Sequence, residues 1–245
     1  MKVFLAGTDS SEFVFADKKI DYMLESFYYI RPWQVNRIAE MKMFLLDSGA
    51  FTFMRSTKRA KNVNLDNYLS KYIDFINNND ITYFFELDVD SIVGYEKVKE
   101  YRKRLETETG KQCIPVWHTS RGREEFLQMC QEYPYVAIGG IVTKEITREQ
   151  YPCFSWFISE AHKQNCKIHG LGFTDTALLQ KYRFDSVDST SWLNGKKFGK
   201  IYYFDNGIMR YKSQPKGEKT VNYKVICDHN IKQWMMYQKY AEINL

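Results

Sequence analysis

The sequence predicts an α/β protein that folds as a single-domain (β/α)8 barrel of the TIM type. Short apolar runs alternate with segments of helical period, three of the runs end in carboxylates, and 245 residues suit one large α/β domain. Strands that alternate with helices at this spacing are typical of a parallel sheet. A closed barrel explains acids at several strand ends better than an open sheet, which often carries a glycine-rich first turn absent here.

Apolar or β-branched runs mark the expected strands. In chain order they cover residues 2–7, 43–48, 81–88, 113–118, 135–141, 167–173 and 186–192, and the eighth strand is expected at 200–204. Segments of helical period lie between them, at 65–76, 95–105, 126–130, 154–161 and 175–182. Each helical segment opens near an Asp, Ser or Gly, residues that favour helix starts.

The chain changes character after the expected eighth strand. Residues 1–205 are expected to form the barrel, and residues 206–245 a loop and helix packed on it. The loop falls at 214–219, and the helix at 227–243 places apolar side chains such as Ile231 and Trp234 on one side.

Composition limits the class of protein. Lys and Arg number 35 against 30 Asp and Glu, a formal net charge of +5 that permits a nucleic-acid partner without requiring one. The five cysteines form no CxxC pair, which favours reduced thiols over a zinc site. The apolar N-terminal run is too short for a signal peptide or a membrane span, so we expect a cytoplasmic protein with no membrane partner.

Carboxylates follow three of the apolar runs. Because the C-terminal ends of parallel strands share one rim, these acids are expected to converge on one pocket. An acid at the end of a buried strand is costly unless it is paired or functional. Such a pocket suits chemistry at a sugar carbon. The acids are Asp47, Glu86, Asp88, Asp90, Asp185 and Asp188.

Strand alternation orders these acids further. Asp185 and Asp188 are three residues apart and face opposite sides, so only one of them lines the pocket. Glu86, Asp88 and Asp90 share one face, where like charges repel unless one is protonated, paired or bound to metal. A metal-dependent hydrolase or lyase that uses these acids and His118 is therefore an alternative.

Several residues near strand ends have both a structural and a functional interpretation. Asp47 caps a helix or turn in the first and works in the pocket in the second. Gly139 and Gly140 make a tight turn or expose backbone N–H groups to phosphate or a base edge. His118 and His169 lie near two strand ends, a position that suits a proton carrier or a structural histidine.

Four stretches together resemble the tRNA-guanine transglycosylase superfamily, enzymes that exchange guanine for a 7-deazaguanine in nucleic acid. Residues 47–51 match its Asp-Ser-Gly-Gly-Phe-Gln motif, with alanine for the second glycine and Thr52 for the glutamine. Residues 135–140 match Tyr-Ala-Ile-Gly-Gly, residues 169–174 are similar to Met-Gly-Val-Gly-Thr-Pro, and residues 184–188 are similar to the Asp-x-x-Asp nucleophile strand. The order and spacing of all four agree.

The resemblance implies a (β/α)8 fold and a role for each matched residue. Asp188 resembles the nucleophile, Asp47 the general acid/base and Asp88 the acid that reads the base edge. The resemblance places the remaining substrate-binding residues at Gly139, Gly140, Ser48, Phe51, His118 (a glutamine in the family) and His169 (a methionine that packs on the base).

The departures from the family pattern concern the polymer. The zinc motif of three cysteines and a histidine is absent, as is the arginine-rich stretch after the nucleophile strand. The compact form is similar to phage-type DNA transglycosylases, which would work in the host cytoplasm. We therefore expect DNA rather than tRNA as substrate, a free 7-deazaguanine as the incoming base, no zinc subdomain, no metal and no cofactor.

Three lysines follow the expected nucleophile strand. Lys196, Lys197 and Lys200 are expected to hold phosphates that flank the reacting nucleotide, and a solvated loop is the alternative. The target guanine has to be flipped out or single-stranded for its sugar carbon to be reached. Two further alternatives remain open, an enzyme that acts on tRNA and a barrel that binds nucleic acid without catalysis.

Overall fold

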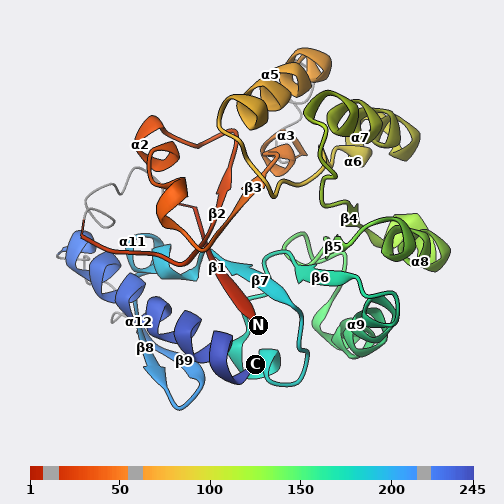
Figure 1. The fold of residues 1–245 in the computed structure, drawn as a ribbon. Coiled ribbons are helices and arrows are strands. Elements are labelled where there is room, and N and C mark those ends of the chain that lie inside the picture. The colour runs from red at the N-terminus through yellow and green to blue at the C-terminus, as the bar shows by residue number, and fades with distance from the viewer. Residues whose placement is uncertain (8–16, 55–62, 214–221) are drawn as a thin grey trace.

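The computed structural model describes residues 1–7, 17–54, 63–213 and 222–245 of the chain. Its centre is a seven-stranded parallel sheet that curls into a half-barrel (Figure 1). The strand order is β3-β2-β1-β7-β6-β5-β4. In chain order the strands are β1 (Lys2–Ala6), β2 (Tyr22–Ser26), β3 (Met43–Asp47), β4 (Val116–Trp117), β5 (Tyr135–Ile138), β6 (Lys167–Gly170) and β7 (Ser186–Ser189).

The run expected at 81–88 forms only isolated bridges. Phe84 bridges Leu46 of β3, and Phe85 bridges Ile114 just before β4, both in the parallel sense. This segment therefore contacts the strands at the two ends of the sheet order.

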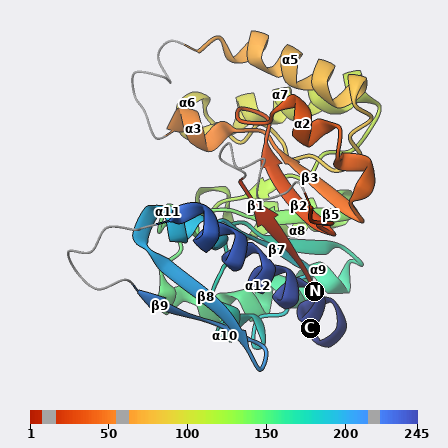
Figure 2. The ribbon, with the colours of Figure 1, turned by 90° about the vertical axis from the view of Figure 1, so that its left-hand side faces the viewer.

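Helices surround the convex side of the sheet (Figures 1 and 2). The predicted helices at 65–76, 95–105, 126–130 and 154–161 are present as α5, α7, α8 and α9. The α-helices are α2 (Pro32–Val35), α3 (Ala50–Met54), α5 (Leu65–Asn78), α6 (Asp90–Val93), α7 (Tyr95–Thr109), α8 (Gly122–Glu132), α9 (Phe154–Lys163), α10 (Thr176–Leu179), α11 (Asn194–Phe198) and α12 (Tyr223–Asn244). Short 3₁₀ turns are η1 (Ile38–Glu40), η2 (Thr119–Arg121), η3 (Arg148–Cys153) and η4 (Ser191–Leu193).

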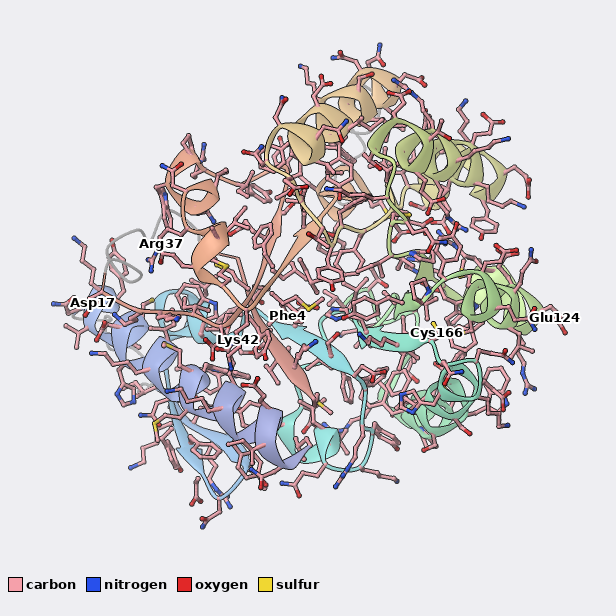
Figure 3. The ribbon with its side chains drawn as sticks, in the orientation of Figure 1. Phe4, Asp17, Arg37, Lys42, Glu124 and Cys166 are labelled. Carbon is pink, nitrogen blue, oxygen red and sulfur yellow. The ribbon has the colours of Figure 1, made fainter. Side chains whose placement is uncertain are left out.

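Two apolar layers follow from strand alternation. Val3 and Leu5 belong to the large core cluster that α-helices share, whereas Phe4 and Ala6 belong to a second cluster. The second cluster fills the concave side with residues from β1, β2, β3, β4, β5 and the 84–85 bridges. Phe4 lies near the centre of this curl in Figure 3. The concave side is therefore largely filled with apolar side chains.

The prediction of an eighth barrel strand at 200–204 is wrong, because the strand found there lies outside the parallel sheet. β8 (Lys200–Asp205) pairs antiparallel with β9 (Ile208–Ser213) in a separate two-stranded sheet. Asn206 and Gly207 both have positive φ, 45° and 85°, the conformation that two-residue hairpin turns require. The expected boundary between residues 205 and 206 falls at this turn.

β2 is a sheet strand that the sequence did not indicate. Glu25 interrupts its apolar run, yet the side chain is buried and accepts a hydrogen bond from Gln34 Nε2 at 2.6 Å. Because Gln34 belongs to α2, the partner that makes this buried acid tolerable is supplied only by the fold.

The C-terminal helix packs against the sheet and the hairpin. α12 contacts β1 and β8, and the Gln238 amide donates hydrogen bonds of 2.7 Å to the carbonyls of Val3 and Tyr22. These bonds tie the helix to β1 and β2, and Figure 2 shows α12 running close to β1. No helix in the described part of the chain is long and apolar enough to span a membrane.

Candidate functional site at the strand ends

Three carboxylates meet at the C-terminal ends of the strands. Asp47 ends β3, Asp88 follows the 84–85 bridges, and Asp188 lies in β7. Burial raises the pKa of Asp47 to about 6, and the nearby carboxylates of Asp188 and Asp88 add to this rise. The Gly49 N–H donates to Asp47 Oδ2 at 3.0 Å and opposes part of the shift. The fold thus brings together the three acids to which the resemblance assigns chemistry.

Asp188 is held by one of its two oxygens. Oδ1 accepts the Gly172 N–H at 2.6 Å and lies 3.3 Å from His169 Nε2. Oδ2 has no hydrogen-bond partner among residues 1–7, 17–54, 63–213 and 222–245. Gly172 adopts φ +70°, a conformation that side chains other than glycine rarely accept. The carboxylate is therefore fixed in orientation while one oxygen stays available for chemistry.

A buried hydrogen-bond chain supports Asp188 from below. Tyr135 Oη and His169 Nδ1 both bond to Ser186 Oγ, the latter at 2.6 Å. An ionised Asp188 can only accept, so we assign the His169 proton to Nε2 and a donated Ser186 hydrogen to Nδ1. His169 is 0% exposed. Its ring is therefore buried against the Asp188 carboxylate, and the base-packing role that the resemblance implies stays a prediction.

Asp185 lies on the other side of the strand. Its Oδ2 accepts the Ile168 N–H and a His162 Nε2 contact, each at 2.9 Å. These partners are structural, and the alternation of β7 separates Asp185 from Asp188 as the sequence indicated.

His118 is clamped between two carboxylates. Nε2 lies 2.7 Å from Asp88 Oδ2, and Nδ1 lies 2.9 Å from Glu145 Oε2. Burial lowers the pKa of His118, but these two acids outweigh it and raise the pKa to about 9. The ring is then an imidazolium at neutral pH with both N–H groups engaged. Both ring nitrogens are thus occupied by carboxylates, and a contact between His118 and a base stays a prediction.

Arg121 forms ion pairs with all three acids of the 86–90 segment. Its guanidinium contacts Glu86 at 2.6 Å, Asp88 at 2.8 Å and Asp90 at 3.3 Å, so these acids do point the same way. Arg102 adds a 2.7 Å pair with Glu86. Burial raises the pKa of Glu86, but the two arginines outweigh this and lower it. The Arg121 guanidinium thus lies where the alternative placed a metal ion. Among the described residues, no group of three or more His, Cys, Asp or Glu could hold a metal ion.

Gly139 and Gly140 leave space for the side chains of His118 and Glu145. A Cβ on Gly139 would lie 2.7 Å from His118 Nε2, and one on Gly140 would lie 2.9 Å from Glu145 Oε2. The paired glycines therefore allow the His118–Glu145 pair to pack against the end of β5, a reason that neither sequence interpretation contained.

The remaining predicted residues are spread more widely. Ser48 is buried, its carbonyl accepts the Tyr68 hydroxyl at 2.6 Å, and Phe51 in α3 is 37% exposed. Lys200 lies on β8, with its ammonium 4.0 Å from the centre of the Tyr211 ring. Lys196 and Lys197 lie in α11, and their side chains fall outside what the structure describes.

Sequence reasoning missed three members of the site. Arg102, Arg121 and Glu145 come from helices and loops after the strands, where charged residues are usually solvated. Arg121 and Arg102 are nevertheless only 8% and 6% exposed. The sequence held one indication of these residues. Three acids on one face of a buried segment need a positively charged partner, although the sequence does not say which residue supplies it.

Comparison with models of known protein families finds no match, and comparison with curated proteins finds none at the threshold of significance. The fold and the site by themselves define an α/β protein with interacting carboxylates at the C-terminal ends of a curled parallel sheet.

Proposed function

We propose that this protein is a base-exchange transglycosylase that replaces guanine in nucleic acid with a 7-deazaguanine through a covalent Asp188–C1′ intermediate. The observation that carries the proposal is the unequal pair of acids. Asp188 is oriented by two contacts on one oxygen, while neighbouring Asp47 has a pKa of about 6. Carboxylates whose environments differ in this way can divide the roles of nucleophile and proton carrier.

The first half-reaction breaks the glycosidic bond. Asp188 Oδ2 attacks C1′ and forms an ester while the C1′–N9 bond breaks and its electron pair leaves with guanine. Asp47 donates its proton to the departing base. A group with a pKa of about 6 is roughly one-tenth protonated at pH 7, which is sufficient for a general acid that also has to serve as a base.

The second half-reaction reverses the roles. Asp47, now ionised, takes the N9 proton of the incoming 7-deazaguanine. The N9 electron pair attacks C1′ and displaces Asp188 as a carboxylate. Two displacements on opposite faces retain the configuration at C1′, as in double-displacement glycosidases. Protons and electrons balance with no further cofactor.

Asp88 is the proposed reader of the base edge. One of its oxygens contacts His118 and the other contacts Arg121, and each oxygen retains a second acceptor position. The cationic partners favour an ionised Asp88 that accepts from the ring N1–H and the exocyclic amine of guanine. Burial opposes that ionisation and raises the pKa of Asp88. The contacts with His118 and Arg121 act in the opposite direction and favour the carboxylate form that can accept hydrogen bonds.

We propose that the curled sheet closes into the (β/α)8 barrel that the sequence predicts. Backbone hydrogen bonds of 3.0 Å run from Phe85 to Leu46 and from Glu86 to Ile114, and one of 2.8 Å runs from Ile114 to Phe84. These bonds support residues 83–86 as a strand between β3 and β4. Closure would place all the strand ends on one rim, where a flipped nucleotide can reach the three acids.

DNA is the favoured polymer, because the chain lacks the family's zinc motif and arginine-rich stretch. A net charge of +5 suits a locally opened strand held by a few phosphate contacts.

The test is incorporation of radiolabelled guanine into DNA and into tRNA by the purified full chain at matched salt. Asp188→Asn is expected to abolish exchange, and Asp185→Asn is the matched control because it removes a carboxylate from the other side of β7. A denaturation-resistant protein–nucleic acid adduct should form with wild type and be absent from Asp188→Asn.

Folded Asp188→Asn that exchanges at a near-normal rate would overturn the assignment of the nucleophile. Incorporation into tRNA with none into DNA would overturn the choice of polymer and leave the two-aspartate mechanism standing.

A further inference from the structure

A recess lies between the loop after β6 and the β8–β9 hairpin. Its volume is ≈ 340 Å³. Figure 2 shows the hairpin running beside α10. Its lining includes Thr174, Asp175, Ser191, Tyr202, Tyr211 and Trp234. We call it the hairpin cleft.

Trp234, one of the residues that line the hairpin cleft, carries an unsatisfied donor. Trp234 is 2% exposed, and its indole N–H has no hydrogen-bond partner in the described part of the chain. A buried N–H without an acceptor is costly, and native proteins rarely retain one without a reason. An acceptor on a ligand in the hairpin cleft would remove this cost.

The hairpin supplies aromatic faces and a cation. Tyr202 and Tyr211 are directly paired across β8 and β9, with ring centroids 5.7 Å apart, and Tyr211 is 51% exposed. Lys200 belongs to the same face of β8 as Tyr202, and its ammonium lies 4.0 Å from the centre of the Tyr211 ring. Exposed tyrosine beside lysine is the combination that stacks a base and meets its phosphate.

Two residues that line the hairpin cleft are close in sequence to Asp188 and to the glycine that binds it. Thr174 lies two residues after Gly172, whose N–H binds Asp188, and Ser191 lies three residues after Asp188 itself. A strand whose reacting nucleotide is at Asp188 therefore has a neighbouring nucleotide within reach of these loops.

We infer that the hairpin cleft binds the nucleobase that flanks the exchanged nucleotide on the substrate strand. This inference rests on the proposed function. The base stacks on Tyr211, one of its ring nitrogens or carbonyls accepts the Trp234 N–H, and Lys200 meets the adjoining phosphate. The site would set the sequence context without touching the reacting atoms.

The experiment measures binding separately from exchange. A fluorescein-labelled single-stranded DNA of about nine nucleotides with one central guanine is titrated by fluorescence anisotropy. Companion strands lack the base on the 5′ or the 3′ side of that guanine. The variants are Tyr211→Ala and Trp234→Phe, with Tyr83→Ala and Trp156→Phe as controls on exposed or half-buried aromatics outside the hairpin cleft.

Tyr211→Ala is expected to weaken binding of the intact strand about 5-fold to 150-fold, the range for loss of one stacked base. Trp234→Phe should weaken it by a smaller factor, and the two controls should leave it unchanged. Against one of the two abasic strands, both hairpin-cleft variants should bind as well as wild type, because the stacked base is already missing.

The outcomes separate the two proposals. Wild type that binds both abasic strands as tightly as the intact one overturns the flanking-base site, even if guanine exchange is robust. Base-dependent effects of both variants in a protein with no exchange activity would support the site and overturn the proposed function instead. Folding of each variant is checked by its thermal transition.

Discussion

Replacing Arg121 with methionine should cost the protein a large share of its stability. Counting its side-chain atoms alone, Arg121 is 1% exposed, and its guanidinium contacts Glu86, Asp88 and Asp90. Removing one partner of a buried ion pair typically costs about 3–5 kcal/mol, because the other charge is left uncompensated. Glu86 retains Arg102 at 2.7 Å and the Val116 N–H at 2.9 Å, so we expect the lower end, about 3 kcal/mol at pH 7.

The loss should depend on pH in a defined direction. In the wild type the lowered pKa of Glu86 means that its ionised form stabilises the fold above the unfolded pKa, and that this contribution is lost as pH falls through the folded pKa. Without Arg121, burial is opposed by fewer cations and the acids protonate at higher pH. The difference between variant and wild type should therefore shrink from pH 7 to pH 5.

The assay is urea unfolding of both proteins at the two pH values. With a slope of about 3 kcal/mol per molar for a chain of this size, the midpoint should fall by about 1 M at pH 7. Arg123→Met is the matched control, since Arg123 is the next arginine in the chain, lies in α8, is exposed and has its guanidinium 4.2 Å from the centre of the Trp156 ring. A loss for Arg121→Met that equals the control, or that is the same at both pH values, would refute the reasoning.

Other predictions test single features. Asp47→Asn should lower the exchange rate about 10²-fold to 10⁴-fold and remove the inflection near pH 6 from the pH–rate profile. The His118 ring should titrate near pH 9 by NMR. Because its pKa is raised from 6.5 to about 9, the stability it contributes is complete below pH 6.5 and lost as pH rises through 9, a decline that unfolding at pH 6, 7.5 and 9 can measure. Gly139→Ala should cost about 1–3 kcal/mol of stability, read from its thermal midpoint, since the new methyl group would overlap His118. Lys196→Ala with Lys197→Ala should flatten the salt dependence of DNA binding by about 0.7 per lost phosphate contact, and an unchanged slope would contradict the phosphate role.

Local sequence patterns predicted much of the secondary structure of this protein. The alternation of apolar runs with helical segments predicted α5, α7, α8, α9 and most of the parallel sheet, because both periods depend only on neighbours along the chain. The same alternation placed Asp185 and Asp188 on opposite faces. It also placed Glu86, Asp88 and Asp90 on a common side, and the structure agrees on both points.

Tertiary structure decided which groups meet. The partner of the three acids is Arg121, which lies more than thirty residues further along the chain at the end of η2, and no local period indicates a contact at that distance. β2 is part of the sheet because Gln34 donates a hydrogen bond to its buried Glu25. β8 pairs outside the sheet because β9, which follows it directly in the chain, is an antiparallel partner. Periodicity determines the face on which a side chain lies, but the charge or strand opposite that face depends on packing between distant segments. The sequence alone therefore determined where the acids stand, and only the fold determined what pairs with them.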